Sequence, residues 1–391
     1  MSRNCENTIV VGCGAVSLDF LAIVAAFPNP DDKIRSTSFK VQGGGNTANA
    51  LTCVSRLGLK PRLISKVADD TQGRDILHEL QVDGVDTSFM ALSLYTSDLC
   101  FAKETEEKKQ GLSGCKSRTC IHTPGFPPMK PDDLPKSSLL TALNGARIIH
   151  FDGRLHETAL VVAHEAVKKN IPILMDAERL REGLDDLVEL ADYVVCAAQF
   201  PQACALFSLK VIYHMSLHEL GASTAPKALV CMLLRLPNIK FVIVTLGKDG
   251  CIMLERSVDE DVSTEEVDVD KLLESLEMRK DRSIHIPTCI SSVNNLSIMS
   301  VTKLRAEGIG TVCGQLYIGT AENIPPSELI DTTGAGDAFI GAVLYAICAN
   351  FEREKMLCFA ATVAASKCRA LGARSGLPYS TDPCLASFMH Y

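Results

Sequence analysis

The sequence predicts an α/β fold, a doubly wound and mostly parallel β-sheet with helices on both faces. Apolar, β-branched segments typical of buried strands alternate with segments of helical periodicity along most of the 391 residues. Hydrophobic residues make up 47% of the chain, which excludes general disorder and allows a sizeable core. The longest apolar run, Ala338 to Ala349, is too short for a membrane span, which needs about 20 residues.

Each expected strand is a short apolar run. The expected strands cover residues 8–12, 62–67, 147–151, 173–176, 193–196, 241–246 and 251–255. Helical periodicity between them predicts helices at residues 46–57, 73–83, 157–169, 184–190 and 228–234. The run 338–349 is hydrophobic nearly all round, which predicts a buried helix. We expect one domain over residues 1–391, because the alternation resumes after each interruption.

Two stretches interrupt the alternation. Residues 101–118 contain the charged run Lys-Glu-Thr-Glu-Glu-Lys-Lys-Gln, which lacks the pattern of a strand. Residues 256–300 begin with acidic residues and end in a segment rich in Ser and Asn, which predicts an acidic surface insertion with a short helix near residues 271–278. A variant splice segment is an alternative explanation for residues 91–116.

Composition restricts the partners and the location. The net charge of −8 and the absence of Trp argue against a nucleic acid, whose phosphates recruit clustered Lys and Arg. The 16 cysteines are scattered without a Cys-x-x-Cys pair, and the N-terminal residues do not have the pattern of a signal peptide. We therefore expect free thiols, a cytoplasmic location, and neither a nucleic acid nor a membrane as partner.

The strongest chemical signal is the segment Asp331-Thr-Thr-Gly-Ala-Gly-Asp-Ala-Phe339, which leads into the apolar helix. Backbone N–H groups in the first turn of a helix lack intrahelical partners, and the helix dipole favours negative charge there. The N–H groups of Gly334, Ala335, Gly336 and Asp337 would thus form an anion hole suited to phosphate. Asp337 would stand where a base takes the proton of an attacking hydroxyl. The alternative is a capping carboxylate after a simple glycine turn.

A second polar segment lies near the N-terminus. The glycines Gly43, Gly44 and Gly45 let the backbone approach a small polar ligand, and Asn49 offers a donor and an acceptor to sugar hydroxyls. The alternative is a flexible glycine turn. The Gly-Cys-Gly segment at 12–14 lacks the third glycine of a dinucleotide fingerprint, so an NAD-dependent oxidoreductase is the weaker hypothesis.

These motifs together resemble the ribokinase-like (PfkB) family of carbohydrate and nucleoside kinases. Residues 331–339 are similar to the family's second signature, and Gly44-Gly-Asn-Thr-Ala-Asn49 is similar to its motif of paired glycines followed by asparagine. Val244-Thr-Leu-Gly247 resembles the strand and turn on the nucleotide side. The resemblance extends from Ile9 to about Pro378.

The resemblance implies an ATP-dependent phosphotransferase that acts on a hydroxyl of a small sugar or nucleoside, with Mg²⁺. It implies Asp337 as general base, Gly334 to Gly336 as anion hole, and Thr245 and Gly247 at the nucleotide. It places Asp19, Gly44, Gly45 and Asn49 at the acceptor. It also implies a small β lid from approximately residues 28–45 and 87–125, and a monomer or a homodimer formed through that lid.

Residues 364–376 resemble the family loop that binds a monovalent cation through backbone carbonyls. K⁺ would be held there by Asp331, Thr333, Ala370 and Gly372. Three departures favour a second hypothesis, a catalytically weak or inactive ligand-binding or scaffold protein. The family's Asn-x-x-Glu is missing after residue 196, with only Gln199 nearby, and the charged run stands where a lid strand is expected. In the cation loop, Ser375 and Gly376 are exchanged.

Overall fold

The structure, a computed structural model, describes residues 7–389 except 25–28, 30, 95–98, 106–116, 126, 180, 182, 199, 201–223, 258–261, 282 and 293–300. The chain divides into two compact units. The first comprises residues 1–162, 324–350 and 362–391, and the second comprises residues 163–323 and 351–361. The alternation of strands and helices continues across this division, so the alternation alone does not reveal it.

In the first unit, parallel strands pair in the order β5-β4-β1-β8. Their bounds are β1 (Ile9–Cys13), β4 (Lys60–Ala68), β5 (Asp86–Ser93) and β8 (Ala146–Phe151). The middle residues of β1, β4 and β8 are fully buried, as in Val10, Ile64 and Ile148. Burial on both faces explains why these strands are continuous apolar runs and why the sequence predicts β1, β4 and β8.

Helix α9 (Ala335–Cys348) is the buried helix predicted from the apolar run. It packs against α1 (Asn46–Arg56) at Gly341, where a Cβ atom would lie 2.6 Å from Cys53 Cβ and 2.7 Å from the Ala50 carbonyl oxygen. Only glycine allows the two helices to approach so closely. The other helices of this unit are α2 (Thr71–Val82), α3 (Lys136–Leu143) and α11 (Ala386–Met389), with 3₁₀ turns η1 (Pro131–Asp133) and η4 (Pro383–Leu385). Helices α4 (His156–Lys168) and α10 (Arg353–Lys367) contain residues of both units.

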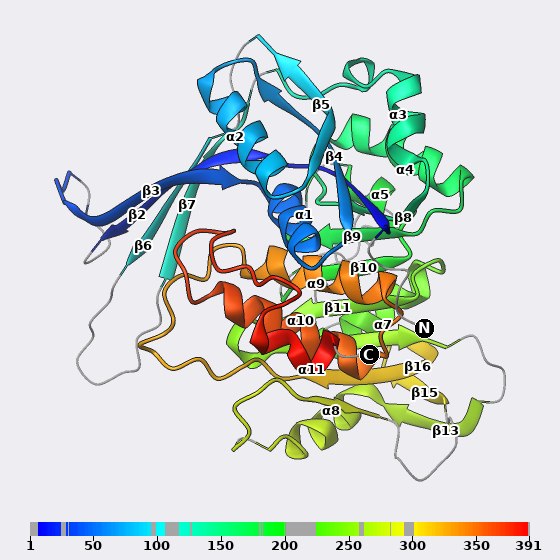
Figure 1. The fold of residues 1–391 in the computed structure, drawn as a ribbon. Helices are drawn as coiled ribbons and strands as arrows, with labels where there is room; N and C mark the ends of the chain where they lie inside the picture. Colours follow the sequence, from blue (N-terminus) through cyan, green and yellow to red (C-terminus); the bar gives the residue numbers. More distant parts are fainter. Residues whose placement is uncertain are drawn as a thin grey trace. The chain divides into compact units, whose positions relative to one another are not determined.

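A separate small sheet of the first unit has the strand order β3-β2-β6-β7 (Figure 1). Its strands are β2 (Ser17–Val24), β3 (Ser36–Gly44), β6 (Leu99–Thr105) and β7 (Ser117–Thr123). Strand β2 pairs antiparallel with β3 and parallel with β6, and β6 pairs antiparallel with β7. Strands β3, β6 and β7 lie within the two ranges from which the resemblance implies a small β lid, and a lid role for this sheet stays a prediction.

The small sheet corrects two expectations. The charged run does not replace a lid strand, because β6 includes its first residues and pairs with a neighbour on each side. Backbone pairing needs no apolar side chain, so a charged sequence forms a strand where two neighbours flank it. The lid ranges 28–45 and 87–125 also omit β2, and residues 87–93 belong to β5 beside β4.

The second unit holds a mixed sheet in the order β9-β10-β11-β12-β16-β15-β13, with β14 beside β16. Strands β9, β10 and β11 are parallel, whereas β12, β16 and β15 each run antiparallel to the preceding strand in this order. The bounds are β9 (Ile173–Ala177), β10 (Tyr193–Ala197), β11 (Phe241–Thr245), β12 (Cys251–Arg256), β15 (Val301–Ala306) and β16 (Gly310–Gly319). Its helices include α5 (Leu184–Val188) and α7 (Ala225–Arg235), near the predicted ranges.

Residues 256–300 are not a simple surface excursion. Strand β13 (Val262–Asp268) pairs with β15, and β14 (Cys289–Ser291) pairs with β16, so both extend the sheet of the second unit. Helix α8 (Val269–Met278) is the expected short helix, and the Asp268 side chain caps it by accepting the N–H groups of Asp270 and Lys271. Among the described residues, no helix has both the length and the apolar character that crossing a bilayer requires.

Candidate active site

The turn before α9 is set by Gly334. Its φ of 76° is left-handed, and a Cβ atom there would lie 2.7 Å from Ala373 Cβ and 2.8 Å from Ala373 Cα. Both conditions require glycine. A Cβ atom on Gly336 would meet no atom within 4 Å, so the space beside this part of the helix start is open. Of the four expected anion-binding donors, the Ala335 N–H is already engaged, since it donates to the Thr332 carbonyl at 3.2 Å.

The expected base and an expected acceptor-binding residue are in direct contact. Asn49 Nδ2 donates a hydrogen bond to Asp337 Oδ2 at 2.8 Å, although the two residues are 288 positions apart in sequence. Asn49 is buried, whereas Asp337 is half-buried at the start of α9. The charge of Asp337 also reaches α1: burial, with a further contribution from Asp337, raises the pKa of the Cys53 thiol to about 12. The hydrogen bond orients the carboxylate, which is what a positioned base requires.

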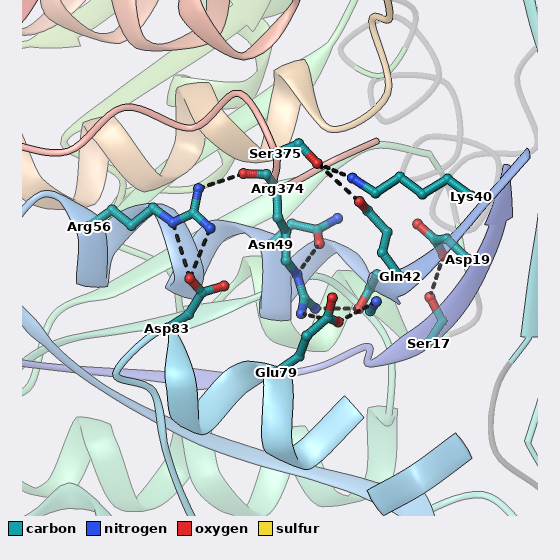
Figure 2. Close-up of polar contacts among 12 residues, drawn as sticks. Ser17, Asp19, Lys40, Gln42, Asn49, Arg56, Glu79, Asp83, Arg374 and Ser375 are labelled. Atoms are coloured by element: carbon teal, nitrogen blue, oxygen red, sulfur yellow. Dashed lines mark hydrogen bonds and ion pairs between the residues drawn. The ribbon is translucent and has the colours of Figure 1, made fainter. Parts of the chain in front are cut away.

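Strands β2 and β3 bring the other acceptor residues together. Their pairing places Ser17 opposite Gly44 and Asp19 opposite Gln42. The buried Asp19 carboxylate accepts a hydrogen bond from Ser17 Oγ at 2.9 Å, and Figure 2 shows it beside Gln42. A Cβ atom on Gly44 would lie 2.1 Å from Asp19 Oδ1, so glycine is needed for this packing. Gly45 precedes α1 with a φ of 93°.

Arg374 connects these residues, although no sequence motif singles it out. The side chain is 4% exposed; its Nε donates to Asn49 Oδ1 at 2.9 Å and its NH2 donates to the Gly44 carbonyl at 3.0 Å (Figure 2). Its NH1 lies 3.6 Å from Glu79 Oε2, and this carboxylate also accepts the Gly43 N–H. Burial lowers the pKa of Arg374, while the carboxylates of Glu79, Asp19 and Asp83 act in the opposite direction. An arginine in a loop is ordinarily interpreted as a surface charge, so only the fold reveals this role.

Asp152 is a second residue that sequence reasoning missed. It follows β8, is buried, and accepts the backbone N–H groups of Ala15 at 2.7 Å, Thr47 at 3.3 Å and Arg154 at 3.1 Å. Asp152 thereby joins the loop after β1 to the first turn of α1. An aspartate directly after a predicted buried strand is the sequence signal that could have identified it.

Two of the four residues expected to hold K⁺, Asp331 and Ala370, contact the ammonium group of Lys367. Lys367 Nζ lies 2.8 Å from the Asp331 carbonyl oxygen, 3.4 Å from the Ala370 carbonyl oxygen and 3.9 Å from Asp331 Oδ2. Both side chains are 0% exposed. The two Asp331 carboxylate oxygens accept the N–H groups of Thr333 and Gly372, each at 2.6 Å. These residues do not fit an additional cation at that position, and a carboxylate so enclosed is not a second candidate for the base.

The expected nucleotide residues belong to the second unit and form a local turn there. Thr245 ends β11, and its Oγ1 donates to the Cys196 carbonyl at 3.3 Å. Gly247 begins the 3₁₀ turn η3 (Gly247–Asp249) with a φ of 61°, is exposed, and would have no atom within 4 Å of a Cβ. This open, left-handed turn allows a ligand to approach the backbone closely.

The described residues contain no group of three or more His, Cys, Asp or Glu side chains that could hold a metal ion. Gln199, the polar residue nearest the missing Asn-x-x-Glu motif, lies outside the described residues. Mg²⁺ in kinases is bound largely by the phosphates of the nucleotide, with one or two carboxylates, and needs no such cluster. Asp176, which is buried in β9 of the second unit, is a candidate to assist in holding Mg²⁺, with Glu178 close behind it in the sequence.

Comparison with known proteins identifies a family and a fold. The sequence profile of the pfkB family of carbohydrate kinases matches residues 7–271 and 315–379. A mouse ribokinase is 23% identical over an alignment that covers 98% of this chain and 96% of that protein. The crystal structure of a ribokinase from Thermotoga maritima superimposes with a TM-score of 0.59 at 18% identity, covering 95% of this chain and 97% of that one. The Arabidopsis thaliana ribokinase complexed with ribose and ATP gives a TM-score of 0.61 at 16% identity, covering 98% and 99%.

Proposed function

The chain belongs to the pfkB family of carbohydrate kinases, and we propose that it transfers the γ-phosphoryl group of Mg-ATP to a hydroxyl of a small sugar or nucleoside. The observation that carries this proposal is the 2.8 Å hydrogen bond between Asn49 and Asp337 at the start of α9. It joins an acceptor-binding group to a base beside a helix N-terminus suited to phosphate.

In the proposed reaction, Asp337 takes the proton of the acceptor hydroxyl as its oxygen forms a bond to the γ-phosphorus. The bond between the γ-phosphorus and the bridging oxygen breaks, and ADP leaves. The first-turn N–H groups at Gly334 and Gly336 and the dipole of α9 would stabilise the charge of the transferring phosphoryl group. Mg²⁺ carried by ATP would neutralise phosphate charge, and Thr245 and Gly247 would contact the nucleotide.

A polyhydroxylated acceptor fits the polar groups on β2 and β3. Asp19 supplies a buried carboxylate, and on the opposing strand Gln42 Nε2 is a buried donor without a hydrogen-bond partner. Vicinal hydroxyls can donate to the carboxylate and accept from the amide at the same time. Because a ribokinase is among the relatives and one similar structure contains ribose and ATP, pentoses are the first acceptors to test.

One of the three departures that favour the inactive-scaffold hypothesis, the missing lid strand, is not found in the structure. Strand β6 is present in the small sheet, so the lid is not missing a strand at the charged run. The start of α9 and its contact with Asn49 also serve no evident purpose in a protein that only binds a ligand.

The test is a screen for ADP release with Mg-ATP across pentoses, hexoses, inositols and nucleosides. We expect one acceptor class to stimulate ADP release well above the rate without acceptor. Asp337→Asn is the matched control, because it removes the base while keeping the size of the side chain. Failure of every acceptor with folded wild-type protein would support the scaffold hypothesis instead.

A further inference from the structure

We propose that the Lys367 ammonium is a built-in monovalent cation, which takes the position of K⁺ beside the anion hole and makes the protein independent of K⁺. The catalytic part of this inference rests on the proposed function, whereas its structural part can be tested without any substrate. It replaces the K⁺ site expected from the sequence, because two of the residues assigned to that ion, Asp331 and Ala370, direct oxygens at Lys367 Nζ.

The surroundings of Lys367 Nζ match the requirements of a small cation. Lys367 is the last residue of α10 and is fully buried. Its ammonium contacts two backbone carbonyl oxygens, Asp331 at 2.8 Å and Ala370 at 3.4 Å, and lies 3.9 Å from the Asp331 carboxylate. The shortest of these distances is that of an ordinary charge-assisted hydrogen bond. Carbonyl oxygens with one carboxylate are also the ligand type that a hard cation prefers.

A second cation would not fit among the same oxygens. It would lie next to the positive charge of Lys367 in a buried region, where like charges repel more strongly than in water. The Asp331 carboxylate is already balanced by Lys367 and occupied by two backbone N–H donors, so it offers no surplus of negative charge. K⁺ could enter only if the Lys367 ammonium moved out of this position, and that movement would break the buried ion pair between Lys367 and Asp331.

The exchange of Ser375 and Gly376 in the loop fits the same arrangement. A Cβ atom on Gly376 would lie 2.5 Å from the Lys367 carbonyl oxygen, so a serine at 376 would collide with the backbone that carries the lysine. Ser375 instead donates from its Oγ to Gln42 Oε1 at 3.2 Å. The glycine lets the loop close over the end of α10.

Lys367 acts on the reaction through the turn before α9, so it is a positioning residue. Its partner Asp331 holds the Thr333 N–H on one carboxylate oxygen and the Gly372 N–H on the other. The next residue of that loop, Ala373, packs against Gly334. The ammonium thus stabilises both chain segments that shape the proposed anion hole, which is how a bound cation would act without touching the substrate.

Two substitutions separate this role from simple packing. Lys367→Ala removes the charge and leaves space for an ion, whereas Lys367→Met removes the charge and fills the space. We expect the thermal unfolding midpoint of the wild type to be the same in KCl and tetramethylammonium chloride at equal ionic strength. The midpoint of Lys367→Ala should fall and should recover by several degrees in KCl or NH₄Cl, whereas that of Lys367→Met should fall without recovery. Phosphotransfer rates should follow the same pattern.

A wild type that is stabilised or activated by millimolar K⁺ relative to tetramethylammonium would overturn the proposal. A Lys367→Ala variant that folds but does not respond to K⁺ or NH₄⁺ would also overturn it. If Lys367→Ala does not fold, thallium-205 NMR of the wild type decides, because Tl⁺ reports on K⁺ sites. Saturable Tl⁺ binding with one ion per chain would contradict the proposal, and its absence would support it. Absence of kinase activity would refute the proposed function but would leave the stability and Tl⁺ results decisive for Lys367.

Discussion

The proposed acceptor residues of the first unit and the proposed nucleotide turn of the second unit are built in different ways. In the first unit, distant chain segments meet through buried polar contacts, with Arg374 bonded to Asn49 and Asn49 bonded to Asp337. In the second unit, residues 246–250 form one turn with an exposed tip at residues 247–249, closed by a hydrogen bond of 2.8 Å from the Leu246 N–H to the Gly250 carbonyl. Buried networks are sensitive to the loss of any member, whereas exposed local turns tolerate change. The first region should therefore respond much more strongly to substitution.

The largest expected effect is that of Asp337→Asn. The amide side chain has nearly the same size as the carboxylate but cannot take the proton of the acceptor hydroxyl, so kcat should fall by about 10²–10⁴-fold. The KM values for acceptor and ATP should change far less, because Asp19 and the anion hole remain. Steady-state kinetics with the acceptor and ATP varied in turn measures kcat and the two KM values. Asp281→Asn, the same change at an exposed carboxylate of the second unit, is the control. An undiminished rate in Asp337→Asn would refute the assignment of the base.

Two glycine substitutions compare the regions directly. Gly334→Ala forces a left-handed φ on alanine and drives its Cβ into Ala373, whereas Gly247→Ala meets the same backbone strain but open space. We expect Gly334→Ala to lower the free energy of unfolding by about 2–5 kcal/mol, the sum of φ strain and overpacking. Gly247→Ala should cost about 1–2 kcal/mol. Urea denaturation measures both, and equal losses would show that the first region is no more tightly packed than the second.

Arg374→Gln should have a smaller effect, divided between stability and acceptor binding. It removes the hydrogen bonds that Arg374 donates to the buried Gly44 carbonyl and to Asn49 Oδ1. The loss should lower the free energy of unfolding by about 1–3 kcal/mol. The acceptor KM should rise more than kcat falls, and the KM for ATP should stay constant. Arg374→Lys keeps the charge but loses the fork of donors, so it should restore the stability only partly. A variant with wild-type acceptor KM would show that Arg374 does not position Asn49.

The smallest expected effect is that of Lys248→Ala in the exposed turn. Its side chain is exposed, so the free energy of unfolding should change by no more than about 0.5 kcal/mol. Chemical denaturation checks this value. A loss as large as that of Arg374→Gln would remove the contrast between the two regions.

Much of the central fold was predictable from local pattern. Buried parallel strands are apolar runs by necessity, so β1, β4, β8 and β9 to β11 stand out in the sequence. The strands of the small sheet and the sheet edge were harder to predict. Strands β6 and β13 contain charged residues, and what makes them strands is pairing with neighbours: β6 pairs with β7, which follows it, and with the distant β2, and β13 pairs with the distant β15. A one-dimensional pattern does not contain the partner of a strand.

The candidate site divides in the same way. The sequence by itself determined that candidate residues stand in local motifs: Asp337 after a glycine turn at the start of a helix, and Asn49 after a glycine pair. Their chemical roles stay predictions. Only the tertiary structure decided that Asn49 contacts Asp337, that Arg374 holds both Asn49 and Gly44, and that an ammonium stands where a potassium ion was expected. The physical reason is that a charged side chain in a loop or at a helix end is interpreted as solvent-exposed. Lys367 and Arg374 take their roles from burial among oxygens supplied by distant segments, and burial of this kind exists only after the chain has folded.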